Sequence, residues 1–313
     1  MEIIKPKKLL KGDVIGIISP ASASKELNKI EQGVNYLEKL GYRVKIGEHV
    51  GREHGYLAGS DDERLSDLHS MFNDKDVKAI FCVRGGYGSG RLLNKINYAL
   101  IKKNPKIFVG YSDITALHLS IFKKTGLITF AGPMLTVDFA GKVNKFAEEI
   151  FWRILTSSKK IGKLHNPRNE KFLILNSGKS EGKILGGNLT VLTSLVGTKF
   201  FPSFRNAILL LEEIAEVPYK IDRFFNQLKL AGIFNQINGI VLGKFIDCVE
   251  NDKTKITLNL SQVIEDYFSE LNVPVMYNFS HGHIKKNITI PIGLNCKINT
   301  SKGFIEITEN AVI

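Results

Sequence analysis

The chain has 313 residues, 43% of them hydrophobic and 24% charged, which is typical of a soluble globular protein long enough for two domains. Its formal net charge of +12 could favour an anionic partner. The lysines are scattered, however, and no basic-aromatic motif of a nucleic-acid-binding protein occurs, so we do not expect nucleic acid as a partner. No apolar run reaches membrane-spanning length, and residues 1–11 lack the apolar core of a signal peptide. We therefore expect a cytoplasmic protein that does not bind membranes.

The first half of the chain alternates between short apolar runs and segments with helical periodicity. Such alternation predicts a parallel sheet with helices on both faces, in a flavodoxin-like α/β domain. The run 77–83 is apolar at both faces and is expected to be a central strand. Strands are predicted at 14–18, 42–46, 77–83, 107–109 and 128–130, and helices at 27–40, 60–72, 92–96, 112–122 and 146–155.

The second half has a different pattern, and a polar stretch separates the two. Residues 158–180 are polar, contain Gly162, Pro167 and Gly178, and are interpreted as a linker. We therefore predict an N-terminal domain at 1–157 and a mixed, β-rich α/β domain at 181–313. In this second domain we expect helices at 189–195, 218–230 and 258–271, strands at 207–211 and 239–242, and several short strands from Val275 onward.

Two loops that follow predicted strands carry candidate site residues. Sites in parallel sheets gather at the carboxyl ends of strands, so the loop after Val83 and the turn at Ser112 could lie side by side. Ser112 precedes a predicted helix, whose free amides can stabilise an oxyanion. The simpler alternative is that Ser112 or Asp113 only caps that helix.

The Gly-rich loop, Arg84-Gly85-Gly86-Tyr87-Gly88, resembles a phosphate-binding loop. It lacks the Lys-Thr end of a P-loop and the full spacing of a dinucleotide-binding motif. A glycine amide could instead approach an oxyanion closely, because no side chain blocks it. Arg84 could bind a substrate carboxylate, or it could simply lie on the surface.

A serine nucleophile needs a base, and the chain offers seven histidines. His118 lies six residues along the helix from Ser112, about 240° round it, and cannot reach back, so we expect a surface or core histidine. His281 and His283 lie in a loop-like stretch, and at strand spacing their rings would share one face. The other four are expected to be solvated: His49, His54, His69 and His165.

The pair His281 and His283 is also a possible metal site, because two histidines at this spacing can bind one ion. No HExxH motif or nearby cysteine supports such a site, and we expect no metal and no other cofactor. Three cysteines are far apart in apolar runs and are expected to be buried, reduced thiols: Cys82, Cys248 and Cys296.

Glu212 and Glu213 directly follow the apolar run 208–211. Consecutive strand residues face opposite ways, so only one of the two carboxylates can point into a cleft. The simpler alternative is one solvated glutamate and one salt bridge. Spacing alone leaves both readings open.

These segments resemble, in order, the LD-carboxypeptidase (muramoyl-tetrapeptide carboxypeptidase) family of serine peptidases, which includes microcin C immunity-like members. The similarity covers essentially the whole chain. The matching segments are 12–13 with 17–20, 83–88, 110–113, 128–134, 186–189, 211–213, 218–223, and 282–283 with 289–293.

The resemblance implies a Ser112–Glu212–His283 triad and no cofactor. It assigns the oxyanion hole to the amides of Asp113 and Gly86. The family has Glu-Asp where this chain has Glu212-Glu213, which leaves the first position intact. His281 stays a second candidate for the base, because it lies two residues before His283.

The implied reaction is release of the terminal D-alanine from a murein tetrapeptide by cleavage of an L,D-peptide bond, in peptidoglycan recycling, by a homodimer. Substrate binding is assigned to Arg84, Gly85 and Tyr87, with Arg84 as the candidate for the terminal carboxylate. Three alternatives remain: a microcin C immunity-type peptidase acting on a peptide-nucleotide antibiotic, a non-catalytic binder of cell-wall peptides, and a metal hydrolase using His281 and His283. The first calls for an aromatic platform, and Trp152, the single tryptophan, lies in a predicted helix away from the site loops.

Overall fold

The computed structural model describes residues 2–313, which form two compact units. The first unit comprises the chain up to Lys159 together with Thr289–Gly293 and Asn310–Ile313, and the second comprises Lys160–Ile288 and Leu294–Glu309. The predicted domain boundaries are therefore wrong in two respects. Residues 158–180 are not a linker, because they contribute two strands to the second unit's sheet. The C-terminal part of the chain also returns to the first unit, where it adds a strand.

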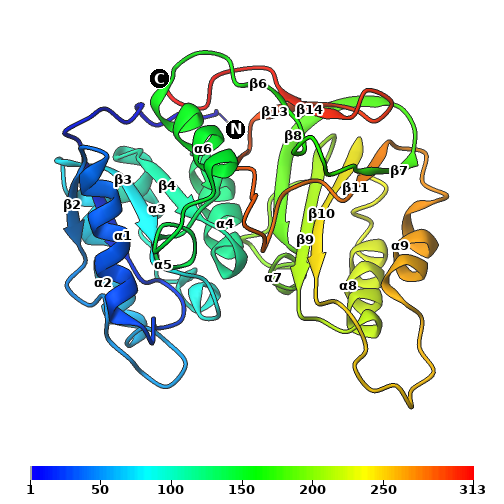
Figure 1. Ribbon diagram of the computed structural model, residues 1–313, viewed down its shortest axis with the longest axis horizontal. Helices are drawn as coiled ribbons and strands as arrows, with labels where there is room; N and C mark the ends of the chain where they lie inside the picture. The colour runs from blue at the N-terminus through cyan, green and yellow to red at the C-terminus, as the bar shows by residue number, and fades with distance from the viewer. Residues whose placement is uncertain (1) are drawn as a thin grey trace. The chain divides into compact units, whose positions relative to one another are not determined.

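The first unit contains a six-stranded sheet whose order confirms the flavodoxin-like prediction (Figure 1). Within the described residues its order is β12-β5-β4-β3-β1-β2; β1 to β5 run parallel and β12 pairs antiparallel with β5. The central β3 is almost entirely buried, as its apolar sequence predicted. The strands are β1 (Val14–Ile18), β2 (Arg43–Ile46), β3 (Val77–Cys82), β4 (Ile107–Gly110), β5 (Thr129–Ala131) and β12 (Ile290–Ile292).

The helices of the first unit pack in two groups, as a sheet covered on both faces requires. One group contains α1 (Leu27–Lys39) and α5 (Leu135–Asp138), which pack against each other. The other contains α2 (Asp61–Asn73), α3 (Tyr98–Lys103) and α4 (Thr115–Thr125). The unit also has α6 (Lys145–Thr156) and two short 3-10 helices, η1 (Ser89–Leu92) and η2 (Ser112–Ile114).

Helix starts in this unit follow local capping chemistry. Ser60 and Glu63 form a capping box at the start of α2, as predicted. The helix predicted at 92–96 is wrong, because only η1 forms there and α3 begins later. The Asn97 side chain accepts a hydrogen bond from the Leu100 amide and so caps α3 at its observed start.

The second unit contains a mixed eight-stranded sheet, as the predicted β-rich domain requires. Its parallel centre is β8 (Lys179–Asn188), β9 (Ile208–Ile214), β10 (Gly239–Ile246) and β11 (Val275–Tyr277). Antiparallel strands flank this centre on both sides: β7 (Leu173–Asn176) beyond β11, and β13 (Asn295–Asn299), β14 (Phe304–Ile307) and β6 (Gly162–Leu164) beyond β8. The helices are α7 (Leu189–Ser194), α8 (Pro218–Leu230) and α9 (Leu260–Phe268).

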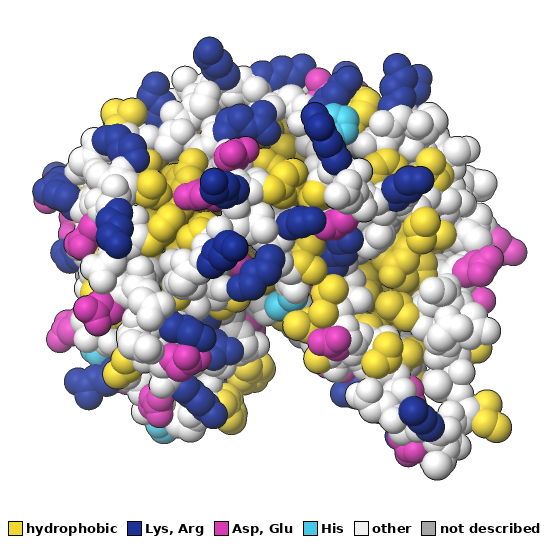
Figure 2. Space-filling view, viewed as in Figure 1, with side chains coloured by type: hydrophobic (Ala, Val, Ile, Leu, Met, Phe, Trp, Pro, Cys, Tyr) yellow, Lys and Arg dark blue, Asp and Glu magenta, His cyan; other side chains and the backbone are white. Residues whose placement is uncertain are grey.

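The surface and the thiols agree with the composition. Lys and Arg side chains are spread over the visible face rather than gathered in one patch (Figure 2). All three cysteines are buried and free of disulfides, as predicted. In the part of the chain that the structure describes, no helix combines the length and apolarity needed to span a membrane.

Candidate active site

Ser112 occupies a strained turn between β4 and η2. Its φ of 65° lies in the left-handed region, which costs a residue with a side chain about 1 kcal/mol. Neither η2 nor α4 has a side-chain capping hydrogen bond, so the alternative that Ser112 or Asp113 only caps a helix is wrong. Gly110 permits the sharp turn, because a Cβ there would lie 2.9 Å from Ile114 Cγ1. The turn therefore presents Ser112 in a conformation that local structure alone does not favour.

The Gly-rich loop after β3 lies against this turn, as expected for neighbouring strand ends. A Cβ on Gly85 would lie 2.8 Å from Ser112 Cβ and 3.1 Å from its Oγ, so only glycine permits the approach. Gly86 has a φ of 114° and packs on Ser22, whose Oγ accepts a hydrogen bond from the Tyr87 amide at 3.0 Å. The loop after β1 thus supports the Gly-rich loop from the other side.

The Asp113 side chain ties the Gly-rich loop to the Ser112 turn. Its Oδ2 accepts a hydrogen bond from the Ser89 amide at 2.8 Å, and Ser89 Oγ donates to the Asp113 carbonyl at 2.6 Å. Burial raises the pKa of the Asp113 carboxyl, although the hydrogen bonds from the backbone of Ser89 and Gly88 oppose that shift. The carboxylate therefore has a structural role, which leaves the backbone amide for the predicted oxyanion hole.

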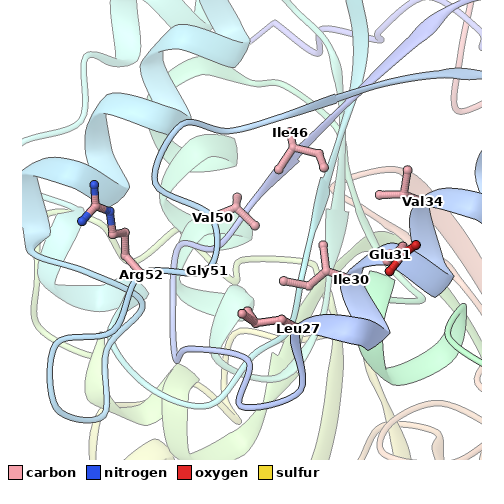
Figure 3. A pocket seen from close by; sticks show the side chains of 8 residues that line it. All are labelled: Leu27, Ile30, Glu31, Val34, Ile46, Val50, Gly51 and Arg52. Carbon is pink, nitrogen blue, oxygen red and sulfur yellow. The ribbon is translucent and has the colours of Figure 1, made fainter.

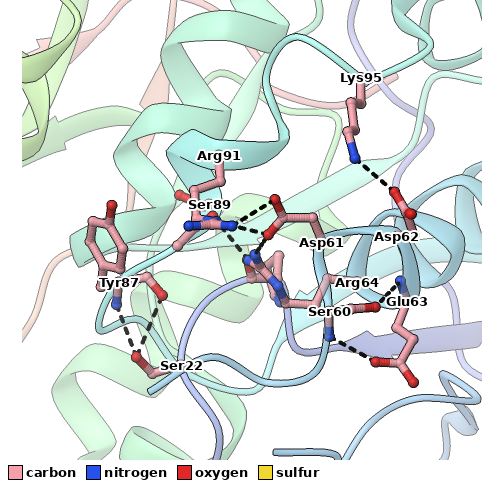
Figure 4. A network of polar contacts seen from close by, with 12 residues as sticks. Ser22, Ser60, Asp61, Asp62, Glu63, Arg64, Tyr87, Ser89, Arg91 and Lys95 are labelled. Carbon is pink, nitrogen blue, oxygen red and sulfur yellow. Dashed lines mark hydrogen bonds and ion pairs between the residues drawn. The ribbon is translucent and has the colours of Figure 1, made fainter. Parts of the chain in front are cut away.

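Arg64 is a buried cation that holds two of these loops and that the sequence reading missed (Figure 4). Its Nη1 donates to the carbonyls of Pro20 at 2.5 Å and Gly88 at 2.9 Å, and its Nη2 pairs with Asp61 at 2.6 Å. In the sequence it follows three acidic residues at a helix start and looks like a solvated charge. No local signal could have revealed it, because its partners come from loops elsewhere in the fold.

The two remaining candidates for substrate binding also lie on the Gly-rich loop. Arg84 is half-buried, with Nη1 3.5 Å from the Ala23 carbonyl, and its buried Nε has no hydrogen-bond partner within the described residues. Tyr87 is 55% exposed and packs edge-to-face on Tyr56, itself 65% exposed, with 5.6 Å between ring centroids. The Gly-rich loop thus carries one ring of an exposed aromatic pair.

In the second unit, the buried Glu212 and the half-buried His283 form an acid–imidazole pair. Glu212 lies in β9, is 1% exposed, and its Oε2 is 2.7 Å from His283 Nδ1. Because a carboxylate oxygen accepts hydrogen bonds, we assign the proton of this contact to Nδ1. Gly282 has a φ of 124°, and a Cβ there would lie 2.8 Å from Glu212 Oε2. A glycine before this histidine is therefore a steric requirement of the pair.

His281 is a core residue. It is 1% exposed, and its Nδ1 contacts the Ile288 carbonyl at 2.9 Å. Burial lowers the pKa of its imidazole, which favours the neutral form. The expectation that His281 and His283 share a face is wrong, because residues 281–284 are not a strand and the two rings bind different partners. Within residues 2–313 no group of three or more His, Cys, Asp or Glu side chains is placed to hold a metal ion.

Three other histidines also make defined contacts. His118 is buried, with Nε2 2.8 Å from the Gly110 carbonyl, and is thus a core histidine, one of the two roles predicted. His49 and His69 are half-buried rather than solvated. His49 Nδ1 pairs with Asp67 at 2.9 Å, and His69 Nε2 accepts a hydrogen bond from the Asn97 amide at 2.9 Å.

Glu213 is buried on the opposite side of β9 from Glu212, so the alternative of one solvated glutamate is wrong. Its Oε1 accepts from Asn188 Nδ2 at 2.8 Å and from the Ile214 amide at 2.9 Å. Its Oε2 accepts from the Thr190 amide at 2.8 Å and from Thr190 Oγ1 at 2.6 Å. Burial raises the pKa of Glu213, and the hydrogen bonds from the Thr190 hydroxyl, the Ile214 amide and the Asn188 side chain oppose the shift. Glu213 therefore anchors the start of α7.

We expect Glu213→Gln to lower the free energy of unfolding by about 2–3 kcal/mol. The amide nitrogen of glutamine would face hydrogen-bond donors, whereas both oxygens of the carboxylate accept hydrogen bonds from them. Denaturant titration measures the change. Glu181→Gln is a matched control: Glu181 lies in the same unit but is 72% exposed, and its substitution should change stability by less than about 0.5 kcal/mol. Equal stability of the two variants would contradict the anchoring role.

The first unit also has a pocket whose lining residues come from a different part of the sequence than the candidate site residues (Figure 3). Apolar side chains from α1 and from the end of β2 form most of its wall, and Glu31 and Arg52 are its charged members. Its lining residues are Leu27, Ile30, Glu31, Val34, Ile46, Val50, Gly51 and Arg52.

Comparison with known proteins identifies the family. The N-terminal domain model of the LD-carboxypeptidases matches residues 15–132, and their C-terminal domain model matches residues 181–298. A probable murein peptide carboxypeptidase of Bacillus subtilis (strain 168) is 43% identical, over 95% of this chain and 92% of its own length. The chain belongs to the LD-carboxypeptidase family. It is thus a hydrolase, a serine-type carboxypeptidase, and the resemblance found in the sequence is confirmed.

Solved structures of this family share the fold. The wild-type apo structure of the microcin C7 self-immunity protein MccF has a TM-score of 0.91 and 29% identity, covering 99% of this chain and 100% of its own. A muramoyltetrapeptide carboxypeptidase from Oxalobacter formigenes has a TM-score of 0.81 and 28% identity, covering 94% and 97%. The N-terminal family match contains Ser112, and the C-terminal match contains both Glu212 and His283.

Proposed function

We propose that this LD-carboxypeptidase releases the terminal D-alanine from murein tetrapeptides by means of a Ser112–Glu212–His283 triad. The Glu212–His283 pair carries the proposal, because a carboxylate on Nδ1 is what a general-base histidine requires. The strained turn at Ser112 supports it from the first unit. The B. subtilis relative, by its name, acts on murein peptides.

In the proposed reaction Ser112 Oγ attacks the carbonyl of the L-configured diamino acid while His283 Nε2 takes the hydroxyl proton. Glu212 holds the proton on Nδ1 and stabilises the imidazolium that forms. Collapse of the tetrahedral intermediate breaks the C–N bond, and His283 returns the proton to the leaving D-alanine amine. Water then hydrolyses the acyl-serine with His283 again as base, which restores Ser112 and frees the tripeptide.

The Gly-rich loop supplies the proposed anion-binding groups. The Asp113 and Gly86 amides would stabilise the oxyanion; the Gly85–Ser112 approach and the anchoring of the loop by Ser89 support this assignment. Arg84 is the proposed partner of the D-alanine carboxylate, supported by its buried Nε and its position directly before Gly85. Guanidinium suits this task because it binds a carboxylate through two parallel hydrogen bonds.

A second candidate is a peptidase that acts on peptide-nucleotide antibiotics: the neighbour MccF is named a microcin C7 self-immunity protein, and one of its structures is a complex with aspartyl sulfamoyl adenosine. The exposed Tyr56–Tyr87 pair favours it, because exposed aromatic rings offer a stacking surface for a nucleobase. Trp152 is no such platform, since it packs on Phe151 and donates to Tyr36.

One substrate panel tests both functions. We expect release of D-alanine from tetrapeptides that end in D-alanine preceded by meso-diaminopimelate, lysine or an amidated diamino acid, and little hydrolysis of a microcin C analogue. Tyr87→Ala should lower kcat/KM for tetrapeptides by less than about threefold, but for a nucleotide conjugate by about tenfold or more if stacking matters. Efficient cleavage of the conjugate with no D-alanine release would establish the second function and reject the first.

We also propose that the enzyme acts in the cytoplasm as a homodimer in peptidoglycan recycling, as the family resemblance implies. Light scattering of the purified protein and fractionation of cells test the two parts of this statement separately.

A further inference from the structure

The segment interpreted from sequence as a linker binds the loop that carries His283. This loop, residues 278–286, begins at Asn278, whose φ of 68° is strained for a residue with a side chain. Asn166 Nδ2 donates to the Asn278 carbonyl at 2.9 Å, and Asn278 Nδ2 donates to the Lys171 carbonyl at 2.9 Å. The Ser280 amide donates to Asn166 Oδ1 at 2.8 Å. Residues 166–171 therefore hold both the backbone and the side chain at the start of the loop.

Glu170 lies at the centre of these contacts. Its Oε2 accepts from Ser280 Oγ at 2.9 Å and pairs with Lys244 at 3.0 Å, and its Oε1 pairs with Lys286 at 3.0 Å. One carboxylate thus contacts Ser280 before His283 and Lys286 after it, and links both residues to Lys244 on β10. Burial by itself would raise the pKa of Glu170, but the bonds from Lys286, Lys244 and Ser280 lower it to about 2. Glu170 therefore stays ionised throughout the pH range in which a histidine base can work.

We propose that Glu170 is a positioning residue for the reaction: through Ser280 and Lys286 it fixes the 278–286 loop, and thereby holds the His283 ring on Glu212. The inference rests on the proposed function for its catalytic consequence, but the positioning itself is a property of the second unit alone.

Backbone hydrogen bonds hold other parts of this loop: the Phe279 amide donates to the Leu242 carbonyl at 3.1 Å and the Lys244 amide donates to the His281 carbonyl at 2.8 Å, which ties residues 279–281 to β10. Within the loop, Gly282 permits the approach to Glu212 but adds conformational freedom, since it has no side chain. Its amide donates to Asn287 Oδ1 at 3.1 Å, and the Ile288 amide donates to the Ser280 carbonyl at 2.8 Å. These bonds close the loop at its end, whereas Glu170 anchors Ser280 and Lys286 on either side of His283.

Glu170→Gln tests the proposal, because it keeps the size of the side chain and removes the charge. We expect kcat for D-alanine release to fall about tenfold to a hundredfold with KM nearly unchanged, the effect of a reacting group misplaced by about 1 Å. In the proton NMR spectrum, the resonance of His283 Nδ1–H should broaden or vanish, because a mobile ring exchanges this proton with water. Glu181→Gln, the same substitution at an exposed site of the same unit, should change neither readout.

A double variant with Ser280 provides a second test of the proposal. Because the Ser280 hydroxyl acts through its contact with Glu170, Glu170→Gln with Ser280→Ala should lower kcat no further than the more severe single variant. An unchanged kcat or an unchanged Nδ1–H resonance in Glu170→Gln would overturn the proposal, even if the melting temperature fell. His283→Ala separates this result from failure of the proposed function. If that variant stays active, the triad is wrong, and the NMR resonance alone then decides whether Glu170 positions the ring.

Discussion

Ser112→Ala is expected to abolish D-alanine release, with kcat at least about 10⁴-fold lower, and to leave the fold intact. The expectation follows from the chemistry: without Oγ no acyl-enzyme forms, and the remaining groups only bind the substrate and its oxyanion. A tetrapeptide assay measures the rate, and thermal unfolding measures the stability.

The strained backbone at Ser112 offers a matched variant. Glycine adopts a φ of 65° without penalty, so Ser112→Gly should be as inactive as Ser112→Ala and more stable, by up to about 1 kcal/mol. Greater stability together with lost activity would show that the strain serves catalysis rather than folding. Activity within tenfold of the wild-type value in either variant would reject Ser112 as nucleophile.

Glu212→Gln is expected to lower kcat by about 10³- to 10⁴-fold, because an amide can present its NH₂ group to His283 and favour the wrong tautomer. His283→Ala should lower kcat at least as much. If the two residues act as a unit, the double variant should be no less active than His283→Ala alone.

Glu213→Gln is the matched control for Glu212→Gln, because it makes the same change at the adjacent residue of β9. It should lose stability, as argued from its four hydrogen bonds, but keep kcat within about threefold below its unfolding transition. The opposite pattern, with Glu213 essential to kcat and Glu212 not, would show that Glu213 and not Glu212 is the acid of the triad.

Local rules predicted most elements of the first unit. The apolar runs at β1 to β5 and the capping box at α2 depend on neighbours within a few residues, and the structure confirms them. The prediction of a helix at 92–96 was wrong, and the cause is again a local one. The apolar periodicity of this segment was real, but Asn97 is the stronger local start signal, and α3 begins after it.

Some residues of the candidate site could likewise be predicted from local sequence, and others could not. Ser112, with the glycine loop beside it, could be found from sequence because both follow strands of one parallel sheet, whose carboxyl ends meet at one edge. The choice between Glu212 and Glu213, by contrast, depended on the family resemblance. Alternation along a strand predicts that the two side chains point to opposite faces of the sheet, but it does not predict which residues each of them contacts.

The amino-acid sequence by itself determined the parallel sheet, the place of the Ser112 turn after a strand, and the family. These depend on periodicity, on glycines at close approaches and on the order of motifs along the chain. Only the tertiary structure decided the partners of other charged side chains: Arg64 on Gly88, Glu213 on Thr190, and Glu170 on Ser280. The physical reason is that a charge loses its hydration on burial and must find its partner wherever the fold brings one, however distant in sequence.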